Sequence, residues 1–106
     1  MTTTLALTGF LALSAGLLAI GIFGILTRRN FILILIAIEI GMNAAILNFV
    51  YFAAFTGAST GLSGQSIAVV LIGFAATEVA VGLAIVLALN RLKGTINVAE
   101  ATDLKL

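Results

Sequence analysis

The chain has 106 residues, of which 62% are hydrophobic and only 8% charged, and its net charge is +1. A soluble domain carries about 25% charged residues, so this composition indicates a membrane protein. Because phosphate neutralisation needs clustered Lys and Arg, the small net charge argues against a nucleic-acid partner. The sequence contains no Cys and no His, which excludes disulfides, thiolate chemistry and imidazole metal ligands.

The first apolar run predicts a membrane-spanning helix over Leu5–Leu26. About 20 apolar residues are enough to cross the hydrocarbon core of a bilayer, which is about 30 Å thick. In a membrane, small residues allow neighbouring helices to come close together. We therefore expect close helix contacts at the glycines of this run, which are Gly9, Gly16, Gly21 and Gly24.

A polar turn follows, with the sequence Thr27-Arg28-Arg29-Asn30. Two adjacent arginines are too costly in hydrocarbon, so the chain must reach the membrane surface here. We interpret Arg28 and Arg29 as topology anchors, and contact with a cytoplasmic loop of a neighbouring subunit is a compatible alternative. Asn30 is predicted to cap the next helix.

The second apolar run predicts a helix over Phe31–Phe55, with Tyr51 near its far end, where a phenol suits the membrane interface. The uncharged stretch Thr56–Gln65 is rich in Gly, Ser and Thr and predicts an exposed loop. A third helix is predicted over Ser66–Asn90, followed by a polar tail, Arg91–Leu106. The predicted fold class is therefore an all-α integral membrane protein with three transmembrane helices, in a single membrane domain over residues 1–106.

The positive-inside rule predicts the orientation of the chain. The basic residues nearest the spans are Arg28 and Arg29 in the first loop and Arg91 and Lys93 at the start of the tail. The N-terminus and the second loop carry no basic side chain, so we expect the N-terminus outside and the C-terminus in the cytoplasm. Gly94 is a predicted helix stop, and we interpret the charged tail as a solvated end, with packing along a partner as the alternative.

Glu39 and Glu78 are the only charged side chains inside the predicted spans. A charge near the bilayer centre costs about 2.5–3.5 kcal/mol, so such a residue indicates an ion pathway or proton relay. The alternative is a structural hydrogen bond between helices. At a rise of 1.5 Å per residue, Glu39 lies about 15 Å from Arg29 and Glu78 about 20 Å from Arg91. Similar depths near the membrane centre favour a lateral relay, which one chain cannot complete.

The helix faces around these acids carry further predictions. Asn43 lies one turn after Glu39 on the same face, where it either hydrogen-bonds the carboxyl group or a water, or forms a helix contact. A ridge of alanines at four-residue spacing consists of Ala76, Ala80, Ala84 and Ala88. At about 100° per residue, Ala76 and Ala80 point nearly opposite Glu78. We therefore expect the third helix to pack tightly through this ridge and to present Glu78 on its other side.

The sequence lacks the motifs of several enzyme classes. It contains no Walker motif, no glycine-rich phosphate loop, no metal-ligand cluster and no nucleophile–base pair. We therefore predict no catalytic residue for bond chemistry in this chain alone.

Three strings together resemble the K-subunit family of respiratory complex I, the NADH–quinone oxidoreductases. They are Thr27-Arg28-Arg29-Asn30, then Ile38-Glu39-Ile40 with Asn43-Ala44, and Ala75-Ala76-Thr77-Glu78-Val79-Ala80-Val81-Gly82-Leu83-Ala84. The resemblance covers essentially the whole chain, including its length, its three spans, the loop positions and both acids. Either acidic string alone is a weak signal, whereas the two combined are specific.

The resemblance implies a subunit of a redox-driven proton pump, between the quinone-binding subunit and the antiporter-like subunits and beside other small membrane-arm subunits. It implies that Glu39 and Glu78 belong to the chain of acids that links quinone chemistry to proton movement. Arg28 and Arg29 match the basic pair of the family's cytoplasmic loop. Thr77 departs from the family, in which many members have alanine. The resemblance further implies no cofactor in this chain, with quinone, FMN and iron–sulfur clusters in other subunits.

Other classes of protein fit the sequence less well. The first alternative is the equivalent small subunit of a cation/proton antiporter or of a membrane-bound hydrogenase complex, although the paired acids and the Arg-Arg loop favour the quinone-reducing complex. A small multidrug transporter has four helices and an acid in the first, and a rotor-ring subunit usually has two helices. A purely structural three-helix adaptor is a further alternative. We expect the bacterial plasma membrane as the location, with the thylakoid as the alternative.

Overall fold

The computed structural model describes residues 2–55 and 61–101. Within these residues it contains the helices α1 (Thr2–Thr27), α2 (Phe31–Phe55), α3 (Gly61–Lys93) and the short α4 (Val98–Ala101). The three long helices are each long and apolar enough to cross a membrane. The predicted fold class, an all-α protein with three membrane-spanning helices, is confirmed.

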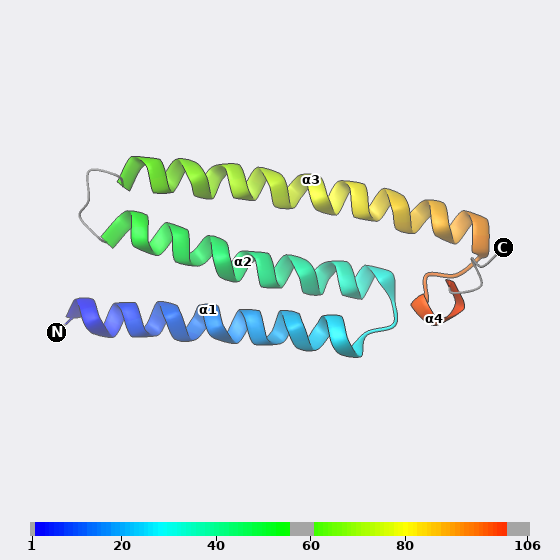
Figure 1. Ribbon diagram of the computed structural model, residues 1–106, viewed down its shortest axis with the longest axis horizontal. Coiled ribbons are helices and arrows are strands. Elements are labelled where there is room, and N and C mark those ends of the chain that lie inside the picture. The colour runs from blue at the N-terminus through cyan, green and yellow to red at the C-terminus, as the bar shows by residue number, and fades with distance from the viewer. Residues whose placement is uncertain (1, 56–60, 102–106) are drawn as a thin grey trace.

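The three long helices lie side by side in one layer, with α2 between α1 and α3 (Figure 1). The molecule measures 58 × 24 × 16 Å, so its smallest dimension is little more than the ~10–12 Å diameter of one helix. Because the helices form a layer rather than a closed bundle, both faces of the layer and both outer helices expose large apolar side chains. These surfaces suit lipid or the helices of neighbouring membrane proteins.

The helix bounds differ from the predicted ranges at α1 and α3. α1 extends beyond both ends of the range 5–26, and α3 extends beyond both ends of the range 66–90. The stretch 61–65, which its composition predicted to be a loop, is helical, and residues 56–60 of that loop lie outside the described residues. The helix continues because Gly64 packs against α2, where a Cβ built on it would lie 2.7 Å from the Ala53 methyl group. Gly64 therefore serves helix packing rather than a turn.

The first loop and the start of the tail carry the predicted helix signals. The Asn30 side-chain oxygen accepts hydrogen bonds from the backbone N–H groups of Ile32 (2.9 Å) and Leu33 (3.4 Å), so the predicted N-cap of α2 is confirmed. Gly94 follows the last residue of α3 with φ of +67°, the left-handed conformation that ends many helices. The predicted helix stop is therefore confirmed as well.

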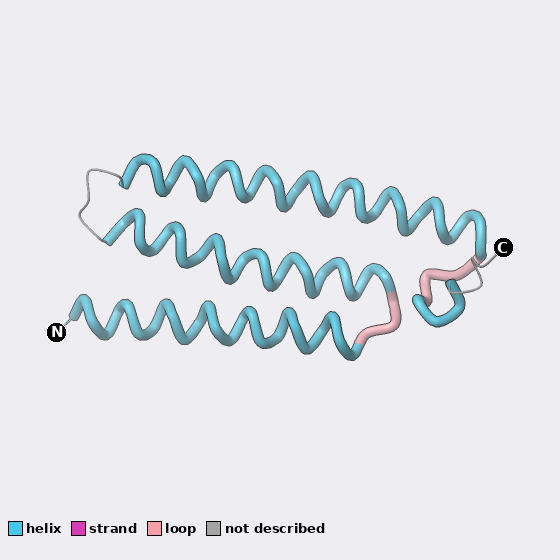
Figure 2. Tube along the Cα trace, viewed as in Figure 1, coloured by secondary structure: helices cyan, strands magenta, loops and turns pink. Residues whose placement is uncertain are grey.

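The tail folds back onto the first loop. The Phe31 N–H donates to the Ile96 carbonyl (2.9 Å), and the Val98 N–H donates to the Arg29 carbonyl (2.6 Å). Asn30 and Asn97 form an isolated antiparallel bridge between the two loop segments, which lie together at one end of the layer (Figure 2). The interpretation of the tail as a solvated end is wrong for this segment, because its backbone groups form hydrogen bonds with backbone groups of the loop.

α1 and α2 come close together at two of the four glycines of α1. A Cβ built on Gly21 would lie 2.9 Å from both the Ala37 carbonyl oxygen and the Gly41 nitrogen, and one on Gly24 would lie 2.6 Å from the Ala37 methyl group. No atom of the described chain lies within 4 Å of a Cβ built on Gly9 or Gly16. The predicted close contact is confirmed at Gly21 and Gly24, whereas the other two glycines face away from α2.

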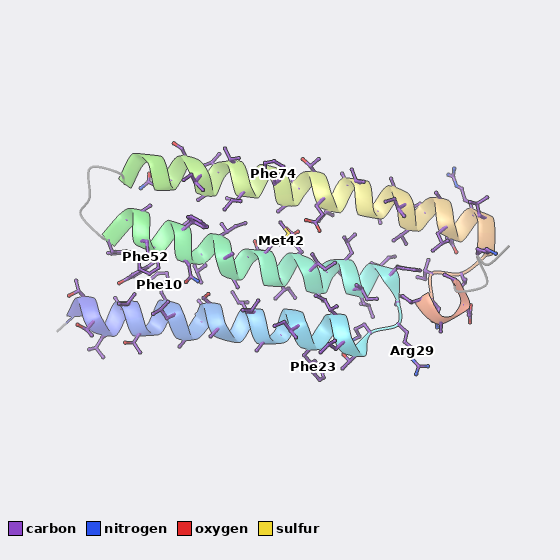
Figure 3. All side chains as sticks on the ribbon, in the orientation of Figure 1. Phe10, Phe23, Arg29, Met42, Phe52 and Phe74 are labelled. Carbon is purple, nitrogen blue, oxygen red and sulfur yellow. The ribbon has the colours of Figure 1, made fainter. Side chains whose placement is uncertain are left out.

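An aromatic cluster closes the other end of the α1–α2 contact. Tyr51 is 5% exposed, and its ring centroid lies 4.6 Å from that of Phe10 and 4.9 Å from that of Phe55. Its hydroxyl group donates to the Thr3 carbonyl at 3.5 Å. Figure 3 shows Phe10 and Phe52 on the facing sides of α1 and α2. Tyr51 therefore lies inside the helix contact instead of facing outward.

Candidate functional site

Glu39 lies on α2 and is half-buried at the contact with α3. It lines a cavity of about 280 Å³ whose other walls are apolar and include Leu35 and Ile36 of α2 and Val79 and Leu83 of α3. The cavity is open to the surface of the layer rather than enclosed, so groups from outside the chain can reach it. The surroundings of Glu39 therefore combine a half-buried acid with an apolar space.

Two close contacts define how α2 and α3 are aligned. A Cβ built on Gly82 would lie 2.8 Å from a terminal carbon of Leu35, and one on Gly64 would lie 2.7 Å from the Ala53 methyl group. Leu35 and Ala53 are separated along α2 by the same number of residues as Gly82 and Gly64 along α3, where the order is reversed. Both contacts therefore belong to one antiparallel register along the helix pair.

This register places Glu39 and Glu78 at the same depth. Glu39 is four residues after Leu35, and Glu78 is four residues before Gly82, which faces Leu35. Four residues correspond to about 6 Å of helix rise, so both acids lie about 6 Å from this contact in the same direction. The sequence-based expectation of similar depths agrees with this alignment.

The two acids lie on opposite flanks of the α2–α3 contact. Around the α3 axis, at 100° per residue, Ala75 and Gly82 lie between Glu78 and Val79. Ala75 is 3% exposed and Gly82 contacts α2, so both face that helix, whereas Val79 lines the cavity of Glu39. Glu78 is exposed beyond the opposite edge of the contact. The chain itself therefore does not bury Glu78, which is exposed at this edge of the α2–α3 contact.

The supporting residues lie near the acids without bonding to them. Asn43 is exposed, and among the described residues it makes no hydrogen bond to Glu39. The Thr77 hydroxyl group donates to the Gly73 carbonyl of its own helix at 2.8 Å. Among the described residues, no three His, Cys, Asp or Glu side chains are grouped closely enough to hold a metal ion.

The alanine ridge of α3 does not pack against α2, so the expectation that it forms the packing face within the chain is wrong. Ala76 and Ala80 are exposed, whereas the buried positions of α3 are Ala68, Ala75 and Val86. Small residues at four-residue spacing mark a surface that a helix can approach closely, but the spacing does not identify the approaching helix. The ridge therefore belongs to the outer side of the layer.

Sequence reasoning did not single out a buried polar pair between α1 and α2. Ser14 is 6% exposed and donates to the Ala44 carbonyl at 3.0 Å, while the Asn48 amide nitrogen donates to the Ser14 hydroxyl oxygen at 2.8 Å. The Asn48 side-chain oxygen is buried and has no hydrogen-bond partner among the described residues. The available signal was the rarity of Ser and Asn within apolar spans, where such residues often join helices.

Three membrane-length helices in one open layer, with two carboxyl groups at one depth, define a small integral membrane protein with intramembrane acids. Residues 9–106 match the family model described as NADH-ubiquinone/plastoquinone oxidoreductase chain 4L. The chain therefore belongs to this family and is a K-type subunit of an NADH–quinone oxidoreductase, a multisubunit enzyme complex of the complex I type.

Curated relatives from several bacteria support this assignment. The chain is 44% identical to NADH-quinone oxidoreductase subunit K of Geobacillus kaustophilus (strain HTA426), with 95% of this chain and 99% of the relative covered. It is 44% identical to the protein of that name from Bacillus anthracis, over 92% of this chain and 93% of the relative. The subunit of that name from Anaeromyxobacter sp. (strain Fw109-5) is 42% identical, over 92% of this chain and 94% of the relative.

Proposed function

We propose that Glu39 and Glu78 form a lateral segment of the intramembrane proton relay that couples quinone reduction to proton translocation. The observation that carries this proposal is their arrangement at one depth on opposite flanks of the α2–α3 contact. A proton handed from one acid to the other crosses the layer within the membrane plane. The catalytic role of the chain is then proton transfer, with the redox steps in other subunits.

The surroundings of each acid favour different neighbours in the relay. Glu39 lines the cavity between α2 and α3, which is open to the surface of the layer, so a bridging water or a group from a neighbouring subunit is its proposed exchange partner. Glu78 is exposed at the opposite edge of the α2–α3 contact, where it is open to a group from a neighbouring subunit. Burial of a lone carboxyl group in hydrocarbon is costly, which favours a partner or a water-filled space beside each acid.

The rest of the surface supports a position inside the membrane arm of the complex. Both faces of the layer expose apolar side chains, and Ala76 and Ala80 offer a small-residue surface for a further helix. We propose that the quinone-binding subunit, the neighbouring small subunits and an antiporter-like subunit cover the surface at Ala76 and Ala80 and part of the two apolar faces. The relatives reported above are all quinone oxidoreductase subunits, which favours this assignment over the antiporter and hydrogenase alternatives.

The orientation belongs to the same proposal. The loop between α1 and α2, which contains Arg28 and Arg29, lies with α4 at one end of the layer, and the N-terminus lies at the other end (Figure 1). With the basic end in the cytoplasm, the N-terminus lies on the outer side of the bacterial plasma membrane. A protease that digests the tail only from the cytoplasmic side of oriented vesicles supports this orientation, and digestion only from the outside contradicts it.

The relay is tested with Glu39→Gln and Glu78→Gln in the assembled membrane complex. Glutamine keeps the size and polarity of the side chain but cannot take up and release a proton at neutral pH. We expect quinone-coupled turnover to fall by about tenfold or more, which corresponds to about 1.4 kcal/mol on the barrier, while native gels show normal assembly.

Glu100→Gln is the matched control, because Glu100 is an exposed acid on α4, outside the long helices. This variant is expected to turn over at the wild-type rate. A Glu39→Gln complex that assembles and retains full coupled turnover overturns the relay and favours the structural adaptor.

A further inference from the structure

A groove of about 290 Å³ lies between α1 and α2, separate from the space between α2 and α3. It lies on the same face of the layer as the Glu39 cavity, because Ile36 and Ile40 line both. Its other lining includes Ile20 and Phe23 of α1, which are 57% and 63% exposed. Figure 3 shows Phe23 on the side of α1 away from α2, so it lines the groove only at its outer edge. The groove is therefore open to the surface, runs along both helices and is lined almost entirely by apolar side chains.

Arg28 is the single charged residue in the lining of this groove. It lies eight residues after Ile20, so the α1 side of the groove extends about 12 Å from the basic loop into the membrane. One leaflet contributes about half of the ~30 Å hydrocarbon core. The groove therefore begins at the depth of the lipid headgroups and ends near the midplane of the bilayer.

The charge of Arg28 is not neutralised by the part of the chain that the structure describes. Arg28 and Arg29 are both exposed, and neither forms an ion pair with a described residue, including Glu100 of the tail that packs on their loop. Figure 3 shows Arg29 extending away from the end of the layer. A guanidinium group at this depth binds phosphate well, because its N–H groups form a fork that matches two phosphate oxygens.

We propose that this groove binds an anionic phospholipid, with one acyl chain along the apolar lining and the phosphate on Arg28. Basic pockets between transmembrane helices are a known way to hold anionic headgroups. The charge of Arg28 at one end of an otherwise apolar lining favours this occupant, because a phospholipid joins an anionic headgroup to an acyl chain.

Photolabelling of the assembled complex in lipid nanodiscs tests the site. The probes are a phosphatidylglycerol and a phosphatidylcholine that carry the same photoreactive group on one acyl chain. Peptide mass spectrometry then locates the adducts. We expect the anionic probe to label Phe23, Ile36 or Ile40, and to do so about fivefold more than the zwitterionic probe, because one basic contact at the headgroup contributes about that factor.

Arg28→Gln is expected to remove this preference, whereas Arg29→Gln, the same change of charge beside the groove but outside its lining, is expected to keep it. Leu33→Trp fills the groove without changing any charge and is expected to reduce labelling by both probes. This variant keeps the test available if the Arg28 variant does not assemble.

Each of three results overturns the proposal. Equal labelling by both probes means that ordinary bilayer lipid covers the groove without headgroup selection. No labelling by either probe means that a neighbouring subunit fills it. An equal loss of preference in the Arg28 and Arg29 variants means that a diffuse positive field attracts the lipid rather than a site at Arg28.

Discussion

Substitution of Gly21 by alanine tests the closest contact between α1 and α2. The added Cβ would lie 2.9 Å from the Ala37 carbonyl oxygen, 2.9 Å from the Gly41 nitrogen and 3.0 Å from the Gly41 Cα. Ordinary contacts to Cβ are 3.4–4 Å, and all three of these atoms belong to the backbone, so a side-chain rotation cannot relieve the clash. The two helices must separate locally by about 0.5–1 Å, which forfeits about a quarter to a half of each affected dispersion contact.

Overpacking of this kind costs about 1–3 kcal/mol, so we expect the associated state of α1 and α2 to weaken by about 5- to 150-fold. Alanine also has a higher helix propensity than glycine, by about 1 kcal/mol. This gain does not offset the loss, because each helix remains formed in the membrane after the helices separate and the propensity acts on both states.

The assay uses the only tyrosine of a chain that has no tryptophan. Because Tyr51 of α2 packs 4.6 Å from Phe10 of α1, near-ultraviolet circular dichroism of this tyrosine reports the α1–α2 contact. SDS is titrated into the chain in detergent micelles, and the Gly21→Ala chain should lose this signal at a lower SDS fraction. Gly16→Ala is the matched control, since no described atom lies within 4 Å of its Cβ. Equal sensitivity of the two variants refutes the packing argument.

Two further predictions concern the helix contacts. Ser14→Ala removes both hydrogen bonds that the hydroxyl group makes to α2 and should cost about 0.6–1.7 kcal/mol in the same titration, whereas Thr8→Ala, whose hydroxyl bonds within α1, should change little. A cysteine pair at Leu35 and Gly82 in this cysteine-free chain should cross-link rapidly with a short thiol reagent. A pair at Leu35 and Val86, displaced by about 6 Å, should cross-link slowly, and the reverse order of rates contradicts the register.

The sequence predicted the three spans well because their signal is simple. Each span is a long apolar run bounded by charges or by polar residues, and Asn30 and Gly94 carry local capping signals that need no knowledge of the tertiary structure. Composition misled at residues 61–65, where Gly and Ser suggested a loop. In a membrane glycine also serves close helix contact, and only the position of Ala53 opposite Gly64 distinguishes the two uses at this residue.

The helix faces were harder to predict than the helices. The alanine ridge and the glycines of α1 have the same small-residue character, yet Gly21 and Gly24 face α2 while Ala76 and Ala80 face outward. The spans are apolar on nearly every side, so polarity does not mark an inner face as it does in a soluble helix. The pairing of the tail with the first loop was also absent from the sequence signal, because it uses backbone groups that every residue carries.

For the two acids, sequence reasoning supplied the residues and an approximate depth from the helix rise alone. It did not predict on which side of the α2–α3 contact each acid lies. Glu39 lines the α2–α3 cavity and Glu78 is exposed at the opposite edge of the contact, a difference that depends on which side of α3 packs against α2. The packing contacts at Ala75 and Gly82 provide that information.

The most direct test of the relay is proton uptake by vesicles that contain the complex with Glu39→Gln, measured with a pH-sensitive dye during donor-driven quinone reduction. The account predicts that the initial rate of proton uptake falls about tenfold or more. The complex should remain assembled, and the Glu100→Gln complex should pump at the wild-type rate. Wild-type proton uptake by the assembled Glu39→Gln complex would contradict the account.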